Sequence, residues 1–293
     1  MRNRVKILRI VSFVLAMTPN TVFAGGENYP IGARSAAMGN ASVTLSDLWA
    51  VHHNQAGLAG LTSPVAGIHY ENRFSMQELS LKAAAFALPL PGEGHNVIGL
   101  SMVSFGYSAY SDMKIGLAFG KQLGDKYSVG LQLDYLQTSI GNEYGRKGAV
   151  AAEAGLQAEI IDDLTMGVHI FNPTRAKLLE YSIQEETEIE RIPTIMRFGI
   201  NYAFSEKVSV SLETEKDVYF KAIFKGGIEY HLIDILYLRG GLSSDPVYNS
   251  FGFGLDINSF RLDFAASKHQ VLGYTTQISL VYNFQKSTTD VAQ

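Results

Sequence analysis

The sequence predicts an all-β fold, a transmembrane antiparallel β-barrel of about 14 strands. Three observations support this prediction: apolar and polar residues alternate, the alternation repeats many times, and the N-terminus carries an export signal. Alternation is clearest in Ser250–Ile257, where one face carries Phe251, Phe253, Leu255 and Ile257 and the other carries Gly252, Gly254 and Asp256. Successive side chains of a strand leave opposite faces, so this period of two indicates β-structure.

The first residues indicate a secretory signal peptide. Three basic residues lie within the first six, an apolar stretch follows from Ile7 to Met17, and Val22-Phe23-Ala24 precedes Gly25-Gly26. This order is typical of a cleaved signal, so we interpret 1–24 as a signal peptide. The alternative, a retained membrane anchor, needs about 20 apolar residues, and this stretch is shorter. The expected location is therefore the bacterial outer membrane.

Composition narrows the class of protein further. After Ala24 no stretch approaches the length of a transmembrane helix, and only helices and closed barrels satisfy their backbone in lipid. The chain has no cysteine, which excludes a disulfide scaffold and a thiol nucleophile. The net charge of −4 carries no nucleic-acid signature. The 28 glycines and 15 tyrosines suit a barrel interior and its interfacial girdles.

Residues 64–285 form the expected barrel, and 286–293 the expected periplasmic tail. The strand-like segments are Pro64–Glu71, Glu78–Leu90, Asn96–Phe105, Met113–Leu123, Tyr127–Ser139, Gly148–Ile160, Leu164–Phe171, Pro193–Phe204, Lys207–Glu215, Tyr219–His231, Ile235–Ser243, Ser250–Ile257, Phe260–Lys268 and Thr275–Gln285. Most run about 9–13 residues, the length at which a tilted strand crosses a bilayer.

Connections are expected to alternate between tight turns on the periplasmic side and longer loops outside. The longer loops would be Gly106–Asp112, Gly141–Lys147, Asn172–Ile192, Ser244–Asn249 and His269–Tyr274. A soluble sandwich would also alternate, with its apolar faces in a closed core. The number and length of the segments favour the barrel.

One parity is consistently apolar and is expected to face lipid: Val129, Leu131, Leu133, Met196, Phe198, Ile200, Leu236, Leu238, Leu262 and Phe264. The other parity carries both signs of charge and is expected to face the lumen: Asp134, Glu153, Gln157, Arg197, Glu213, Lys225, Glu229, Arg239, Asp256, Arg261 and Asp263. Unpaired buried charge is unfavourable, so we expect Glu153, Arg197, Glu213, Lys225, Glu229 and Arg239 to form a neutralising network.

Residues 25–63 do not alternate. A run of small residues from Gly32 to Ser42 precedes Leu45, Leu48 and Trp49 at helical spacing, where Ser46 or Asp47 is a candidate helix cap. The motif residues are Gly32, Ala33, Arg34, Ala37, Met38, Gly39, Ala41, Asp47, Trp49, Asn54, Ala56, Gly57 and Leu58. In this pattern the chain resembles the FadL-like outer-membrane proteins, and more narrowly their PorV/PorQ group. It departs at Gln55, where the family usually has proline, and at Asn40, where a second glycine is common.

The resemblance implies a hatch, an N-terminal segment folded into the lumen. Its expected residues are Arg34, Met38, Gly39, Asp47, Trp49 and Asn54, with Arg34, Asp47, His52 and His53 as partners for lumen charges. The alternative interpretation of the small-residue run is a plain flexible linker.

No catalytic motif stands out, so we expect no enzyme, no cofactor and no metal site. His52 and His53 are adjacent, and adjacent residues seldom converge on one ion. Glu153, Glu213 and Glu229 are candidate acid–base groups, but their basic neighbours favour a charge network. A membrane acyl hydrolase stays open, although no residue locates one.

The longest connection, Asn172–Ile192, is acidic and partly apolar. Its glutamates are Glu185, Glu186, Glu188 and Glu190. We interpret the loop either as an ordinary solvated loop or strand extension, or as a docking surface or lid.

Two classes of function follow from the resemblance. The first is a non-enzymatic, type IX secretion-associated component that binds another outer-membrane or secreted protein. The alternative is a FadL-like, hatch-gated channel for hydrophobic small molecules. The lumen charges argue against a continuous apolar path, so the sequence favours the first class. Outer-membrane lipid is an expected partner in both.

Overall fold

Fourteen antiparallel strands form one closed barrel in the computed structural model, which describes residues 28, 30–92, 94–141, 145–183 and 186–284. The expected signal peptide 1–24, the tail 286–293 and Glu185 lie outside the described residues. The strands are β1 (Val65–Asn72), β2 (Ser80–Leu90), β3 (Asn96–Tyr107), β4 (Tyr110–Leu123), β5 (Tyr127–Ile140), β6 (Arg146–Ile161), β7 (Leu164–Phe171), β10 (Ile195–Ser205), β11 (Val208–Asp217), β12 (Ile223–Ile233), β13 (Leu236–Ser244), β14 (Val247–Ile257), β15 (Phe260–His269) and β16 (Gly273–Asn283).

Each strand pairs with its neighbours in chain order around the barrel, and β1 pairs with β16 to close it. The expected closed barrel is confirmed. Most expected strand boundaries differ from the observed ones by one to three residues, and the largest difference is at β12, which begins at Ile223 and not at Tyr219. Asp217 accepts a hydrogen bond from the Tyr219 amide at 2.7 Å, which turns the chain before the strand starts.

The alternation separates an apolar outer face from a polar inner face. On β5, Leu131 and Leu133 are 63% and 61% exposed, while Gln132 and Asp134 between them are buried. Phe251 on β14 is exposed in the same way. The apolar face meets no second sheet among the described residues, so the soluble sandwich is wrong.

The two ends of the barrel differ less in their connections than expected. At one end all turns are short, such as 162–163 and 258–259. At the other end, two connections expected as longer loops are also tight: β3 and β4 form a hairpin at 108–109, and β13 and β14 join through 245–246. Longer connections at this end are 73–79 and 172–194, and we call it the hairpin end.

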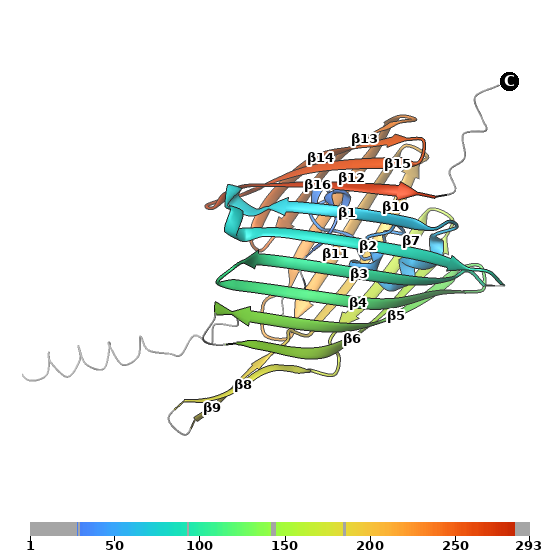
Figure 1. Cartoon of the computed structure of the whole chain (residues 1–293). Helices are drawn as coiled ribbons and strands as arrows, with labels where there is room; N and C mark the ends of the chain where they lie inside the picture. The colour runs from blue at the N-terminus through green and yellow to red at the C-terminus, as the bar shows by residue number, and fades with distance from the viewer. Residues whose placement is uncertain (1–27, 29, 93, 142–144, 184–185, 285–293) are drawn as a thin grey trace, which may run out of the picture.

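A separate hairpin lies within this long connection. Strands β8 (Lys177–Ile183) and β9 (Glu186–Arg191) pair only with each other, as a two-stranded sheet outside the barrel order. Figure 1 shows them projecting beyond the end of the barrel opposite to the end where β16 finishes. The expected loop is therefore a β-hairpin.

Residues 30–63 lie inside the barrel, and we call them the plug. It contains α2 (Ala33–Ala37), α3 (Ala50–His53) and the 3₁₀ helix η1 (Gln55–Gly60). Figure 1 shows these helices inside the ring of strands. Two further 3₁₀ turns, η2 (Arg73–Ser75) and η3 (Gln77–Leu79), connect β1 to β2. None of the helices in the described part of the chain is both long and apolar enough to cross a bilayer.

The helix expected near Leu45 begins later, at Ala50. Asp47 accepts hydrogen bonds from the amides of Trp49 and Ala50, at 2.9 and 3.1 Å, which forms a turn before the helix. The flexible-linker interpretation of Gly32–Ser42 is wrong, because α2 forms within it and packs on β14 and β15.

Small residues let the plug backbone touch the wall. A Cβ at Gly241 on β13 would lie 2.1 Å from the Gly39 amide nitrogen, and one at Gly39 would lie 2.5 Å from the Leu242 carbonyl. Gly39 also has a φ of 66°, which favours glycine. Met38 is fully buried, and its backbone and Cβ lie over Gly227. No larger side chain fits at these contacts.

The hydrophobic core lies between the plug and the first strands. Leu48, Trp49 and Leu58 of the plug pack against inward-facing alanines and valines of β2 and β3. The inward residues of β2 are Leu81, Ala83, Ala85 and Ala87, in alternation with exposed residues. Alanine is needed here because the plug occupies the space that larger side chains would fill.

Candidate functional site

A charged cluster around Glu229 on β12 joins the plug to the wall. Arg34 in α2 donates to both carboxylate oxygens of Glu229, at 2.9 Å from Nε and 2.7 Å from Nη2. Its Nη1 donates to Asp47 at 3.0 Å. Arg239 also donates to Glu229 at 2.6 Å, and to Asp263 at 2.7 Å. Burial alone would lower the pKa of Arg34, but the carboxylates of Glu229 and Asp47 outweigh burial and raise it.

A second cluster surrounds Glu153 on β6. Its carboxylate contacts Lys114 at 2.5 Å and His169 at 2.9 Å, and it accepts from the plug residue Gln55 at 2.7 Å. Lys114 also lies 3.5 Å from Asp134. Gln55 stands where the resembled family usually has proline, and here its side-chain amide makes a second polar link from the plug to the wall.

Glu213 on β11 holds a third part of the plug. One of its oxygens accepts from the consecutive backbone amides of 42–43, at 2.7 and 2.8 Å. Its other oxygen accepts from Lys225 at 3.0 Å. Lys225 and Arg197 then share Glu215, at 2.8 and 2.7 Å. Two consecutive amides on one carboxylate form a polar anchor that fixes the plug backbone.

Asn54 links two parts of the plug to β6. Its side-chain amide donates to the carbonyls of Val43 at 2.8 Å and Leu156 at 3.1 Å. Its side-chain oxygen accepts from the Ala56 amide at 3.2 Å, which caps η1. A Cβ at Gly155 would overlap this oxygen, at 1.9 Å. The motif asparagine therefore has a structural role.

Trp49 and the two histidines lie in the centre of the plug. Trp49 is 3% exposed and packs over Gly32, and His52 stacks on it at 6.3 Å between centroids. His53 Nε2 lies 2.6 Å from the Ile31 carbonyl. Burial, its largest cause, lowers the pKa of His53 to about 4 and also lowers the pKa of His52. Both rings are therefore neutral at pH 7.

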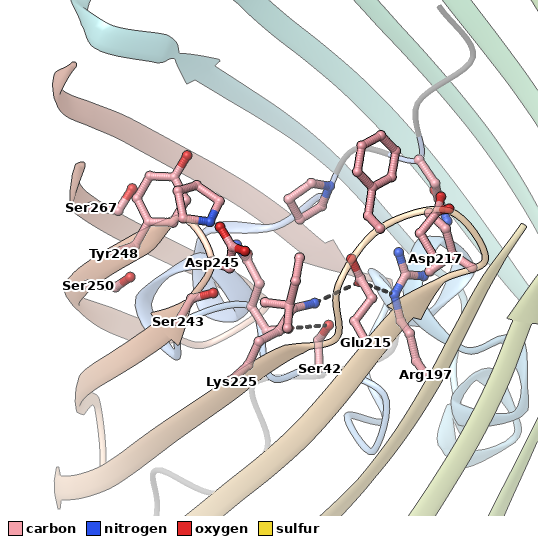
Figure 2. Close-up of a pocket in the computed structure, with 18 of the residues that line it drawn as sticks. Ser42, Arg197, Glu215, Asp217, Lys225, Ser243, Asp245, Tyr248, Ser250 and Ser267 are labelled. Atoms are coloured by element: carbon pink, nitrogen blue, oxygen red, sulfur yellow. Dashed lines mark hydrogen bonds and ion pairs between the residues drawn. The ribbon is translucent and has the colours of Figure 1, made fainter. Parts of the chain in front are cut away.

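A cavity of about 570 Å³ lies between the plug and the hairpin end. Its floor includes Gly39 and Ser42 of the plug. Figure 2 shows Ser243, Ser250 and Ser267 on one side of it and Arg197, Glu215 and Asp217 on the other. Its apolar and aromatic lining comes from Phe74, Pro193, Ile195, Tyr219, Phe220, Ile223, Pro246 and Tyr248.

The structure brings the expected lumen charges together in two places, in ion pairs beneath the cavity and on the cavity lining. Glu153, Glu213, Glu229 and Arg239 pair with plug residues or with each other beneath the cavity, while Arg197 and Lys225 also line it. Glu186, Glu188 and Glu190 belong to strand β9 of the separate hairpin, outside the barrel sheet.

Sequence reasoning missed the aromatic lining. Phe74 lies in a connection, and Tyr219 and Phe220, which we expected to begin a strand, also lie in one, so no period of two gives their direction. The one feature of the sequence that could have indicated this lining is the clustering of apolar residues beside turns at the ends of strands. Among the described residues no three His, Asp or Glu side chains gather as metal ligands.

The fold is that of FadL-type outer-membrane transporters. The toluene transporter TbuX of Ralstonia pickettii matches with a TM-score of 0.61 and 13% identity, over 89% of this chain and 98% of its own. A FadL homologue of Pseudomonas aeruginosa matches with 0.66 and 11%, over 89% and 100%. The toluene transporter TodX of Pseudomonas putida matches with 0.62 and 14%, over 89% and 98%. No protein-family model and no curated protein sequence matches the chain.

Proposed function

We propose that this chain is a non-enzymatic outer-membrane channel for small hydrophobic molecules, and that the plug is its hatch. The single observation that carries the proposal is the cavity of about 570 Å³ above the plug, with its aromatic and aliphatic lining. This volume lies within the range of about 300–1,000 Å³ typical of small-molecule pockets. Longer connections are typically extracellular in outer-membrane barrels, and the long connection 172–194 therefore supports an extracellular hairpin end.

The lumen charges do not oppose this function, although the sequence favoured a protein-binding role because of them. Most of these charges lie beneath the cavity, in ion pairs and in bonds to the plug. A hydrophobic molecule in the cavity can therefore pack against its aromatic and aliphatic lining. Passage toward the periplasm then requires the plug to shift from the wall. The similar proteins TbuX and TodX are toluene transporters, which supports a hydrophobic substrate here.

Uptake of radiolabelled ethylbenzene by intact bacteria tests the proposal. Cells without FadL-type barrels should take it up faster when they express this protein. Ser267→Trp, which fills the half-buried wall of the cavity, should abolish the increase. Leu131→Trp, on the exposed outer face, should preserve it. Equal uptake by both variants and the native chain would show that the cavity is not the route.

A second candidate, the secretion-associated role of PorV/PorQ type, is favoured by the β8–β9 hairpin. This hairpin lies outside the barrel sheet and carries three of the expected glutamates. Replacing 176–190 with a short Gly-Ser linker should weaken copurification of a protein partner if the hairpin is a docking surface. If ethylbenzene uptake rises and no partner is lost, the hairpin is a lid over the channel.

A further inference from the structure

One wall of the cavity carries neutral hydrogen-bonding groups on four adjacent strands. These are Ser243 on β13, Ser250 on β14, Ser267 on β15, and Thr275 and Gln277 on β16. Ser250 pairs in register with Ser267, and Ser267 with Thr275, so their side chains lie side by side. A wall built only for hydrocarbon would not need this row of polar groups.

Two buried acceptors at the end of this row have no donor. Glu71 on β1 is 3% exposed, and its Oε1 accepts from Arg73 at 2.5 Å, while its Oε2 has no partner. Gln277 is 6% exposed, and its Oε1 also has none. Both residues line the cavity and pair directly across β1 and β16. Buried acceptors are almost always hydrogen-bonded, so a donor supplied by a ligand explains both.

The charges that line the cavity balance. Among the described lining residues, four are basic and four are acidic: Arg73, Arg197, Lys221, Lys225, Glu71, Glu215, Asp217 and Asp245. The lining therefore carries no net charge of opposite sign that would offset the free-energy cost of desolvating an anionic or cationic ligand. A neutral donor, a hydroxyl group, is the chemistry that satisfies these acceptors.

An aromatic side chain lies beside the same acceptors. Phe74 lines the cavity, packs edge-to-face on His269 at 5.9 Å between centroids, and donates its amide to Thr275 at 3.4 Å. Phe74 and Ser75 both have left-handed φ angles, 53° and 59°. Strained non-glycine residues of this kind are concentrated at ligand sites. Phe74 gives a ligand ring an apolar surface next to the acceptors.

We propose that the cavity contains a hydroxyl-recognising subsite, formed by Glu71 and Gln277 with the neighbouring serines and Thr275. Its ligand is a neutral small molecule with an apolar, aromatic-sized body and a hydroxyl group. The hydroxyl donates to Glu71 Oε2, and the body packs against Phe74. This inference rests on the proposed function and specifies which hydrophobic molecules the channel prefers.

Calorimetric titration of the full protein in detergent tests the subsite with three matched probes: para-ethylphenol, ethylbenzene and para-ethylbenzoate. The phenol should bind about tenfold more tightly than the other two, because only its hydroxyl satisfies the buried acceptors. Glu71→Gln and Gln277→Leu should each remove most of this advantage. Asp245→Asn, the same carboxylate-to-amide change elsewhere on the cavity lining, should leave it intact.

The outcomes separate the subsite from the function. If ethylbenzene and the phenol bind equally well, the subsite is wrong while the proposed function stands. If the benzoate binds most tightly, the basic side chains select the ligand and the subsite is again wrong. If none of the three binds, both the subsite and the proposed function fail. Circular dichroism of each variant shows whether it keeps the barrel.

Discussion

Arg34 and Glu229 lie 195 residues apart in the chain and form a bidentate pair, in which two guanidinium nitrogens donate to the two carboxylate oxygens. The same carboxylate accepts from Arg239 at 2.6 Å. The carboxylate of Glu229 is therefore shared by one arginine of the plug and one arginine of the wall. This side chain therefore links α2 of the plug to β13 of the wall.

Glu229→Leu should strongly destabilise the protein. The change leaves Arg34 and Arg239 with one carboxylate each and removes three hydrogen bonds. Breaking a buried ion pair by removing one partner costs about 3–5 kcal/mol. The urea midpoint in detergent should fall accordingly, and Glu206→Gln in an exposed turn serves as the control. An unchanged midpoint would show that the pair does not hold the plug.

Two adjacent glycines on β13 give a matched pair for the contact between plug and wall. A Cβ at Gly241 would lie 2.1 Å from the Gly39 nitrogen, whereas one at Gly240 would meet its nearest atom at 3.7 Å. Gly241→Ala should displace the plug and cost about 1–3 kcal/mol, as overpacking does. Gly240→Ala should be nearly neutral. Thermal unfolding of the two variants measures the difference, and equal melting temperatures would contradict the contact.

Removal of the plug should open the lumen. Deleting 28–60 takes away α2, α3 and all of η1, which lie inside the closed ring of strands. We therefore expect ion conductance in planar bilayers to rise well above that of the native protein. Conductance that stays at the native level would show that the segment does not block the pore.

Stability should fall in acid because of the plug histidines. The pKa of His53 is about 4 in the folded protein, against 6.5 as its ordinary value. The unfolded state thus binds the proton first, so stability is full above about pH 6.5 and declines as the pH falls toward 4. The loss from His53 is about 3 kcal/mol at most. His53→Gln should flatten the dependence of the urea midpoint on pH between 7 and 4, and His95→Gln should not.

The barrel could be predicted from the sequence because one physical rule, alternation between lipid and lumen, repeats in every strand. The parity of β2 cannot be predicted from its sequence, because Ala83 and Ala85 are small on the inward face, where the plug packs against them. Ion-pair partners such as Arg34 and Glu229 were beyond prediction, since they depend on strand register and on how the plug folds.

The aromatic lining of the cavity could not be predicted for a related reason. Phe74 and Phe220 lie in connections, where side-chain direction follows the local turn and not a period. The lumen charges were visible, but not the fact that most of them lie below the cavity. Because the sequence does not show that most charges lie apart from the cavity, the sequence interpretation favoured a protein-binding role.

The central claim is that a small hydrophobic molecule occupies the cavity above the plug. Crystals of the protein soaked with para-bromotoluene measure this directly, because the anomalous signal of bromine marks its position. We expect one strong bromine peak between Phe74, Phe220 and Ser267, above the plug residues Gly39 and Ser42. Bromine peaks found only on the outer, lipid-facing surface, with none in the cavity, would contradict the account.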